Sequence, residues 1–146
     1  MKKIKKSKSW NDAYSFDIPI IDIQHKKLFH IYDNLSDMIN SDEPYDDASI
    51  RQILNELEEY TKFHFLTEEN LFIKAGAANA EDHIIEHGLF VKKIQDCMHA
   101  YEYKNPLLAK NMLNFVKKWL ISHILESDIE YKDQMKLYLE ANPDYI

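Results

Sequence analysis

Helical periodicity over most of the chain is the feature that most restricts its fold. Apolar residues recur at spacings of three and four in long segments, which is the pattern of helices with one buried face. There are four such segments, at residues 22–40, 48–74, about 81–103 and about 107–130. With only two glycines and four prolines among 146 residues, the chain has few of the turns that many short strands would need.

Short connections join these segments. They are SDEPYDD at 41–47, AGAANAED at 75–82 and KNP at 104–106. Four amphipathic helices joined in this way predict an all-α fold, an antiparallel up-down-up-down four-helix bundle, in one domain spanning residues 1–146. Residues 1–21 are expected to form an extended N-terminal arm that packs on the bundle. Residues from about 131 to 146 are expected to add a short C-terminal helix.

Charge and composition argue against several classes of protein. The net charge of −7 disfavours a general nucleic-acid binder, although KKIKKSKS at residues 2–9 is locally basic. No apolar region of a signal peptide follows this tail, and no run of 18 apolar residues could span a membrane. Cys97 is the single cysteine, so the chain has no internal disulfide. We therefore expect a cytoplasmic protein without a membrane or nucleic-acid partner.

Polar side chains interrupt the apolar faces of all four predicted helices. They are His25, His64, Glu68, His83, His87 and His123. A lone histidine in such a position is more often a hydrogen-bonded core residue than a metal ligand. Five histidines on four helices are a different case, because burying so many polar groups without partners would be costly. Together with a carboxylate one turn from a histidine, they predict a shared metal centre.

Three further polar residues lie away from the apolar face of their helix. His30 lies about 140° from His25 and His99 about 160° from His83, so both are expected to face solvent and are excluded. Asp128 follows His123 by five residues, again about 140° away on a regular helix. On the residues alone it is better interpreted as a surface charge, because it would reach the centre only through a widened turn such as a π-bulge.

The HIIEH stretch at residues 83–87 also matches an inverted zinc-protease motif. A zinc hydrolase needs three protein ligands, an open water position and a substrate cleft. Here three other histidines converge on the same centre, and a compact bundle offers no cleft for a peptide. We therefore reject the protease and interpret Glu86 as a charge at the edge of its helix. Cys97 is interpreted as a small core residue rather than a redox sensor.

Four segments that carry these histidines and carboxylates resemble those of the hemerythrin family in residue type and order. The resemblance extends over nearly the whole chain. They are IPIIDIQHKKLF, HFLTEENLF, HIIEHGLF and WLISHILESD. The resemblance implies two iron ions per chain. The implied ligands are His83, His87 and His123 for one iron, His25 and His64 for the other, and Glu68 and Asp128 as bridges. At residues 76–78 the chain departs from many relatives, with Gly-Ala-Ala in place of Gly-Tyr-Pro.

Coordination counting on this ligand set predicts an open position. Five imidazoles, two bridging carboxylates and one bridging oxide or hydroxide fill eleven of the twelve positions of two six-coordinate irons. The vacancy falls on the iron held by His25 and His64, where dioxygen could bind with one electron from each iron. Ferritin-like sites use four carboxylates and two histidines. The lower negative charge here favours binding of dioxygen over its activation.

We therefore expect a non-enzymatic protein that reversibly binds dioxygen for storage, scavenging or delivery to an oxygen-using enzyme. The alternative is a di-iron oxidoreductase, or a sensor of oxygen, nitric oxide or redox state, with the same centre. An enzyme would need a proton route to the open iron, whereas the expected neighbours are apolar. They are Leu28, Phe29, Phe65, Trp119 and Leu120. The resemblance places Leu120 over the dioxygen site. No oligomeric state is predicted.

Overall fold

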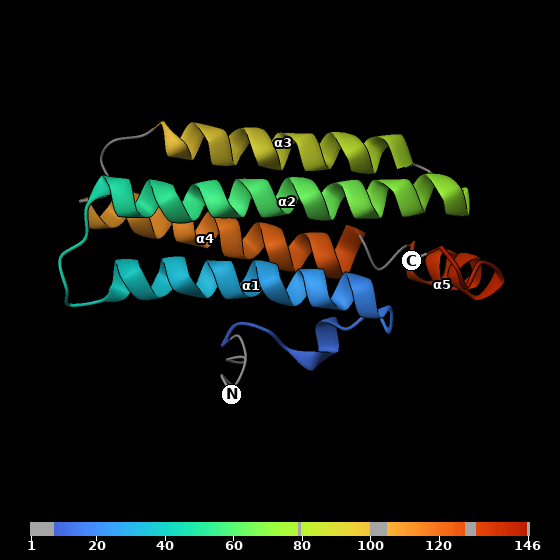
Figure 1. The fold of residues 1–146 in the computed structure, drawn as a ribbon. Coiled ribbons are helices and arrows are strands. Elements are labelled where there is room, and N and C mark those ends of the chain that lie inside the picture. The colour runs from blue at the N-terminus through green and yellow to red at the C-terminus, as the bar shows by residue number, and fades with distance from the viewer. Residues whose placement is uncertain (1–7, 79, 100–104, 128–130, 146) are drawn as a thin grey trace.

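Four long helices lie side by side in the structure, which is a computed structural model (Figure 1). It describes residues 8–78, 80–99, 105–127 and 131–145. The bundle consists of α1 (Pro19–Asn40), α2 (Asp47–Ala75), α3 (Ala80–Met98) and α4 (Pro106–Ser122). A short turn, η1 (Asp12–Tyr14), precedes it, and η2 (His123–Ser127) and α5 (Lys132–Ala141) follow it. The predicted all-α four-helix bundle with a short C-terminal helix is confirmed.

Capping residues explain where two of the helices begin and where α2 ends. The Asp46 carboxylate accepts a hydrogen bond from the Ser49 backbone N–H at 2.8 Å, which caps α2. Asn105 accepts one from the Leu107 N–H at 3.0 Å and caps α4 in the same way. The helix α2 ends at Gly76, whose φ of 68° lies in the left-handed region that glycine adopts without strain.

The first helix begins at Pro19, three residues earlier than predicted. The fixed φ of proline suits the first turn of a helix, and the Ile18 carbonyl accepts a hydrogen bond from the Asp22 N–H at 2.9 Å. The Asp22 carboxylate in turn accepts hydrogen bonds from the Phe16 N–H and the Ser15 hydroxyl, each at 2.7 Å. The predicted arm is therefore shorter than expected, and it is tied directly to the start of α1.

Aromatic side chains attach this arm to the bundle. The Trp10 ring packs edge to face against Phe29 with ring centroids 5.8 Å apart, and Tyr14 stacks on Phe29 at 5.5 Å. Phe16 and Ile18 are buried in the core. The described part of the arm therefore packs on the bundle, as expected.

The helices surround one apolar core. Helix α1 contacts α2 and α4, and α2 contacts α3 and α5. On the remaining side, the rings of Phe90 on α3 and Trp119 on α4 stack with centroids 3.8 Å apart. Of the helices in the described part of the chain, none has the length and hydropathy needed to span a membrane.

Two helix ends differ from the prediction. The third helix was expected to continue to about residue 103, but α3 ends at Met98, and residues 100–104 lie outside the described part of the chain. The fourth was expected to reach about residue 130. Regular α-helix stops at Ser122, where a π-helical turn begins.

The two glycines of the chain make a matched pair for a stability test. A Cβ added at Gly88, in the exposed middle of α3, meets no atom within 4 Å. Gly88→Ala should therefore stabilise the fold by about 0.5–1 kcal/mol, because alanine loses less backbone entropy in a helix. Gly76→Ala should destabilise it by about 1 kcal/mol, because alanine is strained in the left-handed region. Chemical denaturation of both variants measures the difference, and equal effects of the same sign would contradict it.

Candidate cation site

The buried polar side chains of the four helices converge in two overlapping groups. One group consists of His25, His64 and Glu68, and the other of Glu68, His83, His87 and His123. Within each group the potential ligand atoms lie within 4.8 Å of one another, and every member is buried. The structure thus brings together all of the histidines and the glutamate that the apolar faces predicted. Glu68 belongs to both groups.

The carboxylate of Glu68 stands between two sets of imidazoles. Its Oε1 lies 3.0 Å from His25 Nε2 and 2.7 Å from His64 Nε2. Its Oε2 faces the other set, 3.3 Å from His87 Nε2, 3.6 Å from His123 Nε2 and 3.8 Å from His83 Nε2. Each oxygen of Glu68 therefore faces one of the two sets of imidazoles.

Helix geometry accounts for this convergence. His64 and Glu68 are four residues apart on α2, and His83 and His87 are four apart on α3, so each pair projects from one face. His25 comes from α1, and His123 is the C-cap of α4 and the first residue of η2. Each helix of the bundle therefore contributes at least one side chain, and the site depends on all four being in register.

The π-helical turn bears on Asp128. The turn covers His123–Ser127. A π turn has hydrogen bonds one residue longer than those of an α-helix, so it changes the direction in which the following residues point. The sequence required such a widened turn if Asp128 were to reach the centre. The turn is present, but Asp128 lies outside the described residues, so its participation stays a prediction.

The charge of the buried carboxylate is stabilised by its neighbours. Burial by itself would raise the pKa of Glu68, but the charge of His64 and hydrogen bonds from the surrounding imidazoles outweigh burial. Together they hold the pKa of Glu68 well below its ordinary range. Glu68 is therefore an anion in the centre of the bundle, with five imidazoles directed at it.

Polar groups also hold the outer ring nitrogens of three histidines. The Nδ1–H groups of these rings donate to side-chain oxygens. The pairs are His64 with Gln24 Oε1 at 2.7 Å, His87 with Glu69 Oε1 at 3.4 Å and His123 with Glu86 Oε1 at 3.3 Å. A proton on Nδ1 leaves the lone pair of Nε2 free to bind a metal. Glu86 is thus more than the edge charge that the sequence suggested, and the roles of Gln24 and Glu69 were not predicted.

The donor set fits a metal cation. His87 Nε2 and His123 Nε2 lie only 3.0 Å apart and face the same point, where their lone pairs would repel without a cation or proton between them. Glu68 Oε2 is buried and has no hydrogen-bond partner among the described residues. Metal–nitrogen bonds of about 2.1 Å place neighbouring ligand atoms about 3–3.4 Å apart. The separations around Glu68 are close to these values.

Aromatic rings enclose the imidazoles. Phe65 stacks on His87 with centroids 3.8 Å apart, and Trp119 stacks on His123 at 4.4 Å. Two of the five residues predicted to line an oxygen pocket therefore contact the site. The other three are buried: Leu28, Phe29 and Leu120. Their lining of a pocket stays a prediction, and Phe29 makes ring contacts with Trp10 and Tyr14 of the arm.

Three rings against the site were missed. Phe16 packs edge to face on His25 at 5.4 Å, Phe72 on His83 at 4.7 Å, and Tyr131 on His83 at 5.1 Å. Phe16 belongs to the arm, and Tyr131 lies just before α5. Their approach depends on how these end segments fold back onto the bundle, which helical periodicity does not encode.

The two excluded histidines lie outside both groups. His99 is exposed, as expected, and His30 is half-buried rather than fully solvent-facing. Neither belongs to a group of potential ligands in the described residues.

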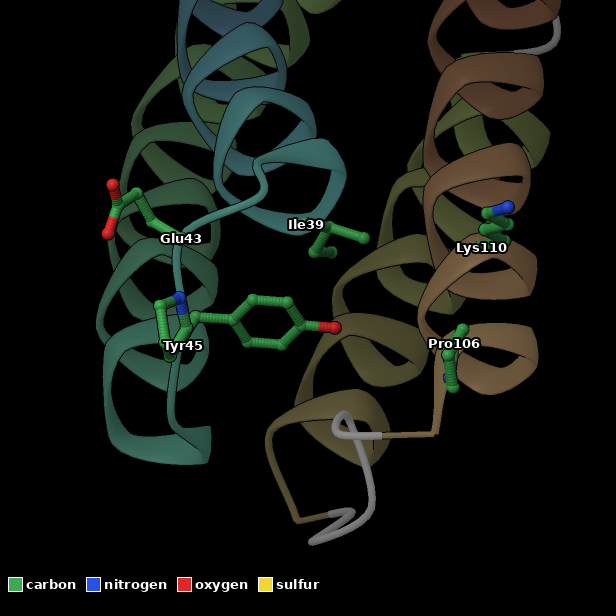
Figure 2. Close-up of a pocket in the computed structure, with 6 residues that line it drawn as sticks. Ile39, Glu43, Tyr45, Pro106 and Lys110 are labelled. Carbon is green, nitrogen blue, oxygen red and sulfur yellow. The ribbon is translucent and has the colours of Figure 1, made fainter.

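Two surface cavities formed by described residues differ in their distance from the site. A pocket of about 290 Å³ at the far end of the bundle is lined by Ile39, Glu43, Pro44, Tyr45, Pro106 and Lys110. Figure 2 shows the Tyr45 ring directed from the loop before α2 toward α4. A groove of about 420 Å³ between α2 and α3 includes Phe65 and His87 in its lining. The convergent imidazoles themselves are thus shielded from solvent.

A four-helix bundle closed around buried histidines and a shared carboxylate defines a cation-binding helical protein. Residues 17–134 match the family model described as "Hemerythrin HHE cation binding domain". The chain belongs to the hemerythrin family.

Curated relatives and solved structures agree with this assignment. The chain is 34% identical over 128 residues to a bacteriohemerythrin of Clostridium acetobutylicum, which covers 85% of this chain and 98% of the relative. It is 28% identical over 127 residues to a bacteriohemerythrin of Pseudomonas aeruginosa, covering 87% and 80%. The crystal structure of a wild-type hemerythrin superposes with a TM-score of 0.71 at 26% identity, covering 86% of this chain and 95% of that one.

Cation binding should depend on the convergent histidines and not on the other two. We expect His87→Ala to weaken binding of a divalent metal at least about tenfold. Loss of a residue that only supports a ligand already weakens metal binding about 10- to 100-fold. His30→Ala and His99→Ala should leave affinity unchanged. Metal analysis after competition with a chelator measures all three. Metal loss in His30→Ala equal to that in His87→Ala would contradict the assignment.

Proposed function

We propose that this chain holds two iron ions and reversibly binds dioxygen at the iron bound by His25 and His64. The observation that carries the proposal is the position of Glu68. One of its oxygens faces two imidazoles and the other faces three. Two cations bound by these sets would share Glu68 as a bridging ligand, and one cation would have one histidine ligand fewer than the other.

The remaining positions follow from the ligand count. Asp128 is proposed as the second bridging carboxylate, and an oxide or hydroxide as the third bridge. One position then stays open on the iron with two histidines. Two iron ions held by these residues would supply one electron each to dioxygen, which is the chemistry that a reversible carrier needs.

The surroundings of the two-histidine set favour binding over further chemistry. His25 and His64 are fully buried. The rings of Phe16 and Phe65 flank them, with centroids 5.4 Å from His25 and 5.9 Å from His64. Apolar walls exclude water and slow the proton transfer that reduction of dioxygen requires. Storage, scavenging or delivery of dioxygen fits this setting better than an oxidoreductase or a sensor.

Metal content and an optical spectrum test the proposal. Protein purified from iron-replete cells should contain about two irons per chain. After reduction, exposure to air should produce a visible absorption band, and removal of oxygen should abolish that band. A zinc-loaded protein, or one iron per chain, would rule out the di-iron centre. Irreversible conversion to the oxidised form on first exposure would instead favour an oxidoreductase or a sensor.

Leu120 is proposed to guard the open position. It is 1% exposed and lies three residues before His123 on the same face of α4. Leu120→Asn should keep both irons but raise the autoxidation rate about tenfold, equivalent to about 1.4 kcal/mol of barrier, because a polar side chain admits water.

The matched control is Leu113→Ala, a truncation two turns earlier on α4 that is compared with Leu120→Ala. Both remove the same atoms from the core, so both lose stability. Only the change at residue 120 should speed the decay of the oxygenated band at equal iron content. Equal decay rates in all variants would place the guarding residue elsewhere.

A further inference from the structure

A series of hydrogen bonds fixes the orientation of the Gln24 amide. The Thr67 hydroxyl donates to the Phe63 carbonyl at 3.1 Å. This uses its hydrogen, so Thr67 meets Gln24 as an acceptor, and the Gln24 amide nitrogen donates to it at 3.2 Å. The amide oxygen of Gln24 is therefore the atom that faces His64 Nδ1, at 2.7 Å.

This orientation determines the tautomer of His64. An amide oxygen can only accept, so Nδ1 carries the proton and Nε2 is the ring atom that would bind a cation beside Glu68. Gln24 is 2% exposed. The partner of His64 is therefore a neutral group that is shielded from solvent and stays neutral at every pH.

The three-histidine set has partners of a different kind. Glu69 accepts from His87 and Glu86 from His123, and their side chains are 21% and 40% exposed. A carboxylate that accepts a hydrogen bond from a ligand imidazole raises the basicity of that imidazole, and with it the stability of the more highly charged metal ion. An amide oxygen does this more weakly, because it carries no formal charge.

We propose that Gln24 is a positioning residue that makes the two-histidine subsite a less electron-rich donor set than the three-histidine subsite. Gln24 orients His64 as a ligand without adding negative charge to the iron that binds dioxygen. That iron must be ferrous again when dioxygen leaves, and a carboxylate at position 24 would stabilise its ferric form. The inference rests on the proposed di-iron function.

Exchanging amide and carboxylate at these positions tests the inference. Gln24→Glu keeps the shape of the side chain and adds a charge. We expect this variant to retain two irons, with a midpoint potential lower by at least about 59 mV, the equivalent of a tenfold change in the one-electron equilibrium. The control is Gln52→Glu, the same change at an exposed position of α2, which should leave the potential unaltered.

The converse exchange acts on the other subsite. Glu69→Gln and Glu86→Gln should raise the potential and weaken iron retention against a chelator about 10- to 100-fold. Both residues are partly exposed, so these variants keep the inference testable if Gln24→Glu does not fold. A redox titration with mediators and a chelator competition provide the readouts, neither of which measures oxygen binding.

The outcomes separate this inference from the proposed function. If the parent holds two irons but its oxygen band does not reverse, the proposed function fails, while the potentials still decide the role of Gln24. If Gln24→Glu and Glu86→Gln both have the parent potential, the inference is overturned, whatever the parent does with oxygen. A raised potential in Gln24→Glu would overturn it as well.

Discussion

The carboxylate of Glu68, buried among five imidazoles, is the constraint on which the rest of the structure depends. A lone ionised carboxylate in an apolar core would be strongly destabilising. Its five neighbours come from all four helices, so the charge is stabilised only when the helices have the correct register and neighbours. The bundle therefore specifies the site, and the site selects one arrangement of the bundle over others with similar apolar packing.

Support for the histidines passes from each helix to the next. Gln24 on α1 holds His64 on α2, Glu69 on α2 holds His87 on α3, and Glu86 on α3 holds His123 on α4. Each hydrogen bond thus orients an imidazole and connects two neighbouring elements of the bundle. These hydrogen bonds are directional, whereas apolar packing alone would not fix the orientation of the imidazoles.

The sequence predicts those features of the site that depend on the geometry of a single helix. Helical periodicity places His64 beside Glu68 and His83 beside His87, because residues four apart share a face. The same reasoning failed for Gln24 and Glu86, whose partners lie on other helices, where orientation depends on how the helices pack. Periodicity placed His123 correctly, but it did not predict where regular α-helix ends, because the π-helical turn that begins at His123 departs from the 3.6-residue period. The start of α1 also differs from the prediction, because the fixed φ of Pro19 suits the first turn of a helix.

The five imidazoles and Glu68 also link folding to cation binding. His87 Nε2 and His123 Nε2 lie 3.0 Å apart, and Glu68 Oε2 is buried beside them, so one cation could contact all three atoms. A bound cation satisfies these atoms together, so its binding free energy stabilises the fold. The end segments contribute here as well, since Phe16 and Tyr131 cover His25 and His83. Phe16 belongs to the arm and Tyr131 lies just before α5. The segments outside the bundle therefore help to shield the site from water.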